Sequence, residues 1–257
     1  MRTLAASLQS PARRADTGAL TTVSLSARAT RLIALAGLGS FALIVVGAFV
    51  APPLWNAPGT NASAAHVAAY LQANHGRTIA SLYIYSLAMG LFLCFTGGLW
   101  SWLRQIEPAP QPLSAVFAFG ALALAVLSFA AFATAGVMSY RPQQPAFAAS
   151  LSDLTFGLLA LSAIPTAVCL GAYAALVLRH RCLPAWTGWL ALLAVDAHLL
   201  IAASFMSRGD FLSLESSVIV WVPATFFAWI LATSVVLLRV ADRTGLGNRA
   251  ERAPWRS

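Results

Sequence analysis

Residues Leu113–Met138 read LSAVFAFGALALAVLSFAAFATAGVM, an apolar run that contains no charged side chain. An α-helix needs about 20 apolar residues to cross a hydrocarbon core about 30 Å thick, because it rises about 1.5 Å per residue. This run therefore predicts a membrane-spanning helix. Five more long apolar runs are present, and three of them also contain no charged side chain: Leu32–Val50, Thr78–Trp102, Leu151–Leu178, Pro184–Met206 and Ser216–Leu238. The sequence predicts an all-α polytopic membrane protein with six transmembrane helices.

The positive charges indicate how the helices are oriented. The chain has no lysine, and most of its arginines precede the first run, follow the last one, or lie in the second and fourth connections. Positive residues near the ends of spans are retained in the cytoplasm, so both termini are predicted to be cytoplasmic. The arginines on that side are Arg2, Arg13, Arg14, Arg28, Arg31, Arg104, Arg179, Arg181, Arg239, Arg243, Arg249, Arg252 and Arg256. Those on the other side are Arg77, Arg141 and Arg208.

The composition supports a membrane protein without a soluble domain. Hydrophobic residues make up 59% of the chain and charged residues 9%, whereas about a quarter of an average soluble domain is charged. We expect a cytoplasmic Arg-rich tail over 1–31, a transmembrane domain over 32–238 and a second cytoplasmic Arg-rich tail over 239–257. The net charge of +8 is explained by the topology, so no nucleic-acid partner is predicted; membrane lipids are. The alanine-rich, lysine-free composition indicates a bacterial cytoplasmic membrane.

The first span and the cysteines each raise an alternative. The first apolar run is longer than the 7–15 residues of a signal peptide's core, so an uncleaved anchor is preferred to a signal peptide. The cysteines, Cys94, Cys169 and Cys182, show no CxxC spacing. They therefore indicate neither a zinc site nor a disulfide framework. No metal or cofactor is predicted.

The longest connection, about Ala51–Arg77, is predicted to contain an external amphipathic helix between spans 1 and 2. Within Asn61–His75, apolar residues recur at i, i+3, i+4 and i+7, which is the spacing of one helical face. Asn61 or Ser63 is the expected N-cap. The residues on the apolar face are Ala64, Val67, Ala68 and Leu71. This helix is expected to lie flat on the outer surface or to cover the end of the bundle.

Ionisable residues inside the spans are the candidates for function. Asp153 shares its helical face with Gly157, Ala160, Ala167 and Gly171, at about 100° per residue. Small residues mark the closely packed face of a membrane helix, so Asp153 is predicted to point into the bundle. By the same test His198 shares a face with Thr187, Ala191, Ala194 and Ala202 and also points inward. A carboxylate–imidazole pair between the two helices is geometrically possible.

Asp196 is about 200° around the helix from His198, so the two cannot share one face. It lies close to the middle of the membrane, where an ionised aspartate costs about 2.5–3.5 kcal/mol on insertion scales. We therefore expect Asp196 either to meet another helix rather than lipid or to remain protonated. It is expected to bind a proton or a substrate, or to hold two helices together as a protonated acid. The candidate partners are Tyr83, Tyr85, Ser86, Thr225 and Thr233.

Three stretches resemble a family of uncharacterised six-span integral membrane proteins of bacteria, common in actinobacteria and classed as a domain of unknown function. They are Ala64–Tyr70 continuing to Asn74-His75-Gly76-Arg77, Leu151-Ser152-Asp153-Leu154-Thr155-Phe156-Gly157, and Leu183-Pro184-Ala185-Trp186-Thr187-Gly188-Trp189-Leu190. The resemblance covers most of residues 32–238 and implies a fold but no activity. It implies that His75, Arg77 and Asp153 occupy recurrent polar positions toward the outer face.

Three function classes remain open. A small-molecule or proton-coupled transporter would use Asp153, Asp196 and His198, but no internal repeat of the kind found in many transporters is present. Pro165 and Pro223 are expected to kink the fourth and sixth spans, which does not establish a gate. An intramembrane lipid- or isoprenoid-modifying enzyme would need a buried carboxylic acid, and no catalytic motif accompanies one. A non-catalytic membrane subunit or sensor-like protein, alone or with a protein partner or as a homo-oligomer, requires nothing that the sequence lacks and is our prediction.

Overall fold

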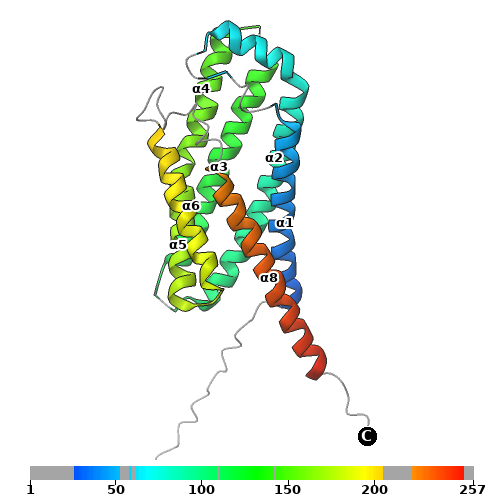
Figure 1. Cartoon of the computed structure of the whole chain (residues 1–257), viewed down its shortest axis with the longest axis vertical. Helices are drawn as coiled ribbons and strands as arrows, with labels where there is room; N and C mark the ends of the chain where they lie inside the picture. The colour runs from blue at the N-terminus through cyan, green and yellow to red at the C-terminus, as the bar shows by residue number, and fades with distance from the viewer. Residues whose placement is uncertain are drawn as a thin grey trace, which may run out of the picture.

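The computed structural model describes residues 26–52, 58–59, 62–108, 110–141, 143–204 and 222–251, with side chains described as far as Arg243. All the regular elements in these ranges are helices (Figure 1). They are α1 (Ala27–Val50), α2 (Ala64–Ile106), α3 (Leu113–Tyr140), α4 (Pro145–Leu161), α5 (Ala163–His180), α6 (Ala185–Ala203) and α8 (Ala224–Glu251). Taking α4 and α5 as one, six helical segments in the described part of the chain are long and apolar enough to cross a membrane. The chain is a helical multi-pass membrane protein, as the sequence predicts.

The helices pack in a closed ring. Each of α1, α2, α3, α5, α6 and α8 contacts the next, and α8 returns to contact α1. The chain enters and leaves at one end of the bundle, which we call the terminal end; the opposite end is the far end (Figure 1). At the terminal end Arg31 of α1 forms an ion pair with Asp242 of α8, with 2.7 Å between Nη2 and Oδ1. An even number of spans brings these two helices together.

The predicted external helix exists, but it is not a separate element. Residues 64–77 form the first part of α2, which we call the α2 arm; it crosses the far end before the helix turns down through the bundle (Figure 1). Ser63 is the N-cap, and its Oγ accepts a hydrogen bond from the His66 N–H at 3.3 Å. The other proposed cap, Asn61, lies outside the described residues. Of the predicted apolar stripe, Val67, Ala68 and Leu71 are buried and Ala64 is half-buried, with Val67 and Leu71 packed on α3 and α4.

The fourth span is broken into two helices rather than kinked within one. α4 ends at Leu161 and α5 begins at Ala163. Pro165 has no N–H to give to the carbonyl of Leu161, and its ring crowds that carbonyl, so a regular α-helix cannot continue through this point. Ser162 joins the two pieces and donates its hydroxyl to the Leu159 carbonyl at 2.6 Å.

The last described helix differs from its predicted bounds at both ends. The prediction was Ser216–Leu238, whereas α8 begins at Ala224, one residue after Pro223. Pro223 therefore precedes the described helix instead of kinking it, and residues 205–221 lie outside the described residues. α8 continues to Glu251, well into the stretch assigned to the C-terminal tail, and extends beyond the bundle at the terminal end (Figure 1).

Glu107 fixes the start of α3. Its carboxylate accepts hydrogen bonds from the backbone N–H of Leu113 at 2.6 Å and of Ser114 at 3.0 Å, two groups that have no partner within the helix. Partial burial acts to raise the pKa of this carboxyl. The hydrogen bonds from Ser114 and Leu113 outweigh it, so that the pKa lies below its ordinary value of 4.5. An ionised Glu107 is therefore part of the folded structure.

Candidate functional site

His198 faces the interior, as predicted. The buried face of α6 consists of Thr187, Gly188, Ala191, Ala194, His198 and Ile201. The His198 side chain is 6% exposed, and its Nδ1 donates to the Ala194 carbonyl of the preceding turn at 2.7 Å. Its ring meets the edge of Phe226 in α8, with 5.7 Å between ring centroids. The imidazole is thus held by its own helix and by an aromatic ring.

Asp196 is exposed and, among the described residues, does not meet another helix of this chain as expected. It lies opposite the buried face of α6, and no hydrogen bond or ion pair to it occurs among the described residues. The expected partners have other neighbours: Ser86 donates to the Leu82 carbonyl, Thr225 to the Val222 carbonyl, and Tyr85 stacks on Phe132. α6 packs against its neighbours through the face that carries its small residues. Asp196 lies on the opposite face and therefore points away from the bundle.

Asp153 is also exposed, contrary to the predicted inward orientation. Ala160 and Ala167, assigned to the same face, are buried. The break at Ser162 interrupts the helical phase for Ala167, but Ala160 lies in α4 with Asp153, so burial along this face also changes along α4 itself. Thr155, two residues further along α4, is the residue that meets a neighbouring helix: its hydroxyl is 2.8 Å from that of Thr134 in α3. The predicted pairing of Asp153 with His198 is therefore not formed.

His75 and Arg77 belong to the α2 arm and hold the ends of other helices. The Nδ1 of His75 donates to the Ser139 carbonyl, near the end of α3, at 2.9 Å. Arg77 donates from Nε to the Val50 carbonyl at 3.0 Å and from Nη2 to the Ala51 carbonyl at 2.8 Å. The last carbonyls of a helix lack partners within it and carry partial negative charge, so both contacts stabilise helix ends.

The centre of the bundle is filled by a column of rings that the sequence analysis did not identify. Tyr173 and Trp229 are fully buried, with ring centroids 5.1 Å apart. The Tyr173 hydroxyl donates to Thr187 Oγ1 at 3.1 Å and lies 3.3 Å from Thr233 Oγ1. This network joins α5, α6 and α8. The column runs through Phe117, Tyr173, Trp229, Phe226 and His198.

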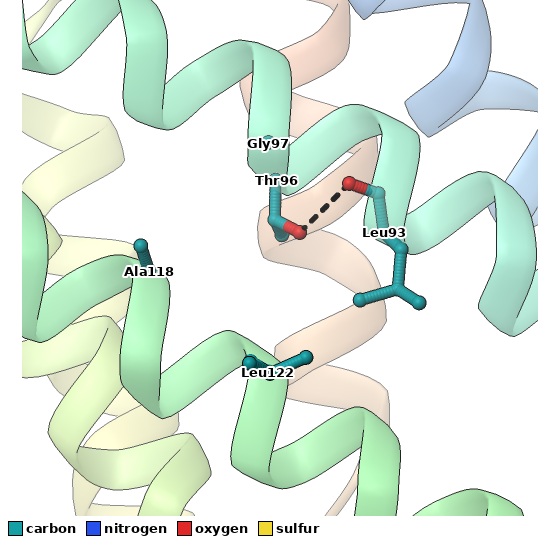
Figure 2. Close-up of a pocket in the computed structure, with 5 residues that line it drawn as sticks. All are labelled: Leu93, Thr96, Gly97, Ala118 and Leu122. Atoms are coloured by element: carbon teal, nitrogen blue, oxygen red, sulfur yellow. Dashed lines mark hydrogen bonds between the residues drawn. The ribbon is translucent and has the colours of Figure 1, made fainter.

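A cavity of about 160 Å³ lies between α2 and α3. It is lined by Leu93, Thr96, Gly97, Ala118 and Leu122, shown in Figure 2. The Thr96 hydroxyl is turned back to its own helix, donating to the Phe92 carbonyl at 2.9 Å and lying 3.3 Å from the Leu93 carbonyl. The cavity can therefore take an aliphatic group such as a lipid chain, but it presents no acid or base for chemistry.

Within the described ranges, no group of three or more His, Cys, Asp or Glu side chains is placed to hold a metal ion. The described cysteines are free, and Cys94 is exposed. No family model, curated protein or solved structure compared with the chain matches it. The resemblance to six-span bacterial proteins therefore stays a prediction, and the position of each charged side chain is the main guide to function.

Proposed function

We propose that this chain is a non-catalytic subunit or sensor-like protein that acts by assembling laterally with another protein in the membrane. The observation that carries the proposal is the outward position of Asp196 in the middle of a membrane-spanning helix. A carboxylate exposed to lipid at this depth is unfavourable by about 2.5–3.5 kcal/mol on insertion scales. A polar group on a neighbouring protein would remove that cost, and assembly would then be favoured.

The interior supports a non-catalytic role. The largest fully buried side chains include Trp229, Tyr173, Phe92 and Phe95, so the described part of the bundle centre is closely packed with rings. Asp153 and Asp196 both lie on exposed faces, away from the buried His198. A transporter that used all three residues would need a conformation in which they line one path. An enzyme using a buried carboxylic acid would need a different acid from these two.

We further propose that the termini are cytoplasmic, in the cytoplasmic membrane of a bacterium, and that the chain belongs to the six-span family it resembles. Arg31, Arg104, Arg179 and Arg239 lie toward the terminal end, and Arg77 and Arg141 toward the far end, which supports this orientation. A fluorescent protein fused to the C-terminus should fluoresce, and alkaline phosphatase fused at the same position should be inactive. The reverse pattern would contradict the orientation.

Lateral assembly can be tested by photo-crosslinking in intact cells of the source organism. A photoreactive amino acid replaces Leu193, which is exposed one turn from Asp196 on α6, or Leu35, which is exposed on α1. Position 193 should give one discrete protein adduct, which Asp196→Asn abolishes, and position 35 should give only lipid adducts. Lipid adducts alone at position 193 would contradict the proposal.

A further inference from the structure

Four residues form a stripe along the exposed face of α6. Trp189, Leu193, Asp196 and Leu200 are separated by four, three and four residues and so lie along one line. Trp189 is 64% exposed, Leu193 56% and Leu200 44%. We call these four residues the α6 outer face. Apart from Asp196, it offers only apolar and aromatic surface, as a helix facing lipid or another transmembrane helix does.

The depth of Asp196 follows from its position in the helix. It is preceded by residues 185–195 and followed by residues 197–203 of α6. At about 1.5 Å per residue it lies about 16 Å from one end of the helix and about 10 Å from the other. Neither distance lets the short aspartate side chain reach the membrane surface, in contrast to the long side chains of lysine and arginine. Any group that pairs with an ionised Asp196 must therefore come to it within the membrane.

A second copy of this chain has no cation to offer at that depth. Thr233 of α8 is level with Thr187, near the start of α6, because both hydroxyls meet Tyr173. Arg239 is six residues further along α8, and therefore toward the terminal end. The other described arginines also stand near helix ends or in the α2 arm, and His198 at the depth of Asp196 is buried. Two copies packed side by side would bring Asp196 against Asp196, and like charges at close range repel.

We propose that the α6 outer face is a docking surface for one transmembrane helix of a different protein, and that this helix carries a basic side chain at mid-membrane that pairs with Asp196. The inference rests on the proposed function and specifies the chemistry of the partner. Complementary charge decides the choice of partner, since an ion pair offsets part of the cost of both charges in lipid, whereas an apolar helix leaves Asp196 unpaired. The leucines and Trp189 supply the surrounding packing.

The test uses synthetic polyleucine peptides that span the membrane, added to full-length protein in phosphatidylcholine vesicles. One peptide carries a single lysine at its centre, one has only leucine, and one carries the lysine two turns from the centre. Binding is measured by energy transfer between labels on the protein and peptide. The central-lysine peptide should bind about tenfold more tightly than the other two, the scale of polar contacts between membrane helices.

The variants decide whether Asp196 is responsible. The preference for the central lysine should disappear in Asp196→Asn and persist in Asp196→Glu. It should also persist in Asp153→Asn, which removes an exposed carboxylate from α4 instead. Equal binding of the three peptides to the wild type would overturn the inference, as would a preference that survives Asp196→Asn. Photobleaching of the labelled protein alone is the second readout: dimers that Asp196→Asn abolishes would show that a second copy covers this face. That result would contradict a basic partner while leaving lateral assembly intact.

Discussion

At the scale of single residues, Arg77 shows how a charge at the edge of the membrane is used in the fold. Its guanidinium reaches from the α2 arm to the end of α1 and donates to the carbonyls of Val50 and Ala51. It also lies 3.4 Å from the Phe49 carbonyl. One side chain thus satisfies carbonyls that would otherwise need water or lipid headgroups, and it ties the arm to the first helix.

Replacing Arg77 with alanine should therefore destabilise the protein, by about 1 kcal/mol given that the side chain is exposed. Arg77→Lys should recover only part of this, because an ammonium group cannot span several carbonyls as the guanidinium fork does. The measurement is the thermal unfolding midpoint in detergent. Arg141→Ala is the matched control: its exposed side chain makes no hydrogen bond among the described residues, so this variant should unfold like the wild type.

The sequence predicted the orientation of His198 but not that of the two aspartates. The small residues around His198 lie on an unbroken helix and do face the core, so counting at 100° per residue succeeded. For Asp153, part of the predicted face lies beyond the break at Ser162, and within α4 the face is buried at Ala160 but exposed at Asp153. For Asp196 burial is expected because its exposure to lipid is energetically unfavourable. α6 nevertheless packs through the face that carries its small residues, and Asp196 lies on the opposite face. Only the packed bundle reveals that Asp196 is left outside.

At the scale of elements, a close contact between a glycine and the backbone of a neighbouring helix lies beside the break in the fourth span. A Cβ added at Gly120 of α3 would stand 2.9 Å from the Pro165 carbonyl oxygen and 2.9 Å from the Cys169 backbone nitrogen. The contact is with backbone, which cannot move aside as a side chain can. Gly136, on the same helix, has nothing within 4 Å of its Cβ position.

These two glycines give a matched pair of substitutions. Gly120→Ala should push α3 away from α5 and lower stability by about 1–3 kcal/mol, the usual cost of overpacking. Gly136→Ala should be neutral or slightly stabilising, since alanine favours the helix by about 0.5–1 kcal/mol over glycine. Unfolding in increasing mole fractions of SDS measures both. Equal effects of the two substitutions would show that α3 and α5 do not approach so closely.

Glu107 gives the start of α3 a dependence on pH. Because its folded pKa lies below 4.5, its contribution is fully present above that pH and is lost as the pH falls through the folded pKa. Glu107→Gln should cost about 0.5–1 kcal/mol at pH 7, as the loss of a helix cap does. The variant should converge with the wild type in acid, as measured by SDS unfolding between pH 7 and pH 3. A constant difference across this range would contradict the role of the ionised carboxylate. Asp153→Asn should follow the wild type throughout, because Asp153 makes no side-chain hydrogen bond to the described residues.

The bounds of the helices could be predicted from the sequence only where composition changes sharply. Leu113 begins both the predicted span and α3, because the Pro-rich connection before it cannot continue a helix. The amphipathic stripe of the α2 arm was evident from Val67, Ala68 and Leu71. Its continuity with the second span was not, since Gly76 and Arg77 resemble the end of a helix. The hydrogen bonds from the Arg77 guanidinium to the end of α1 stabilise this charged side chain within the continuous helix.

At the scale of the whole molecule, the six spans found among the described residues follow from hydrophobic length, and their even number places the start of α1 and the end of α8 at the same end of the bundle. The ring is closed by α8 against α1, and its centre is occupied by Tyr173 and Trp229. Because this interior is filled by side chains, a partner protein is expected to bind on the outer surface of the bundle. On this outer surface the exposed Asp196 is energetically unfavourable for a protein that is surrounded only by lipid.

The most direct test is the mass of the complex released from its own membrane in native nanodiscs. One chain has a mass of 27.0 kDa. Native mass spectrometry should show the wild type bound to a different protein subunit, and Asp196→Asn as a single chain. A wild type that is itself a single chain would contradict lateral assembly, and a complex at a whole multiple of the chain mass would contradict a partner of different sequence.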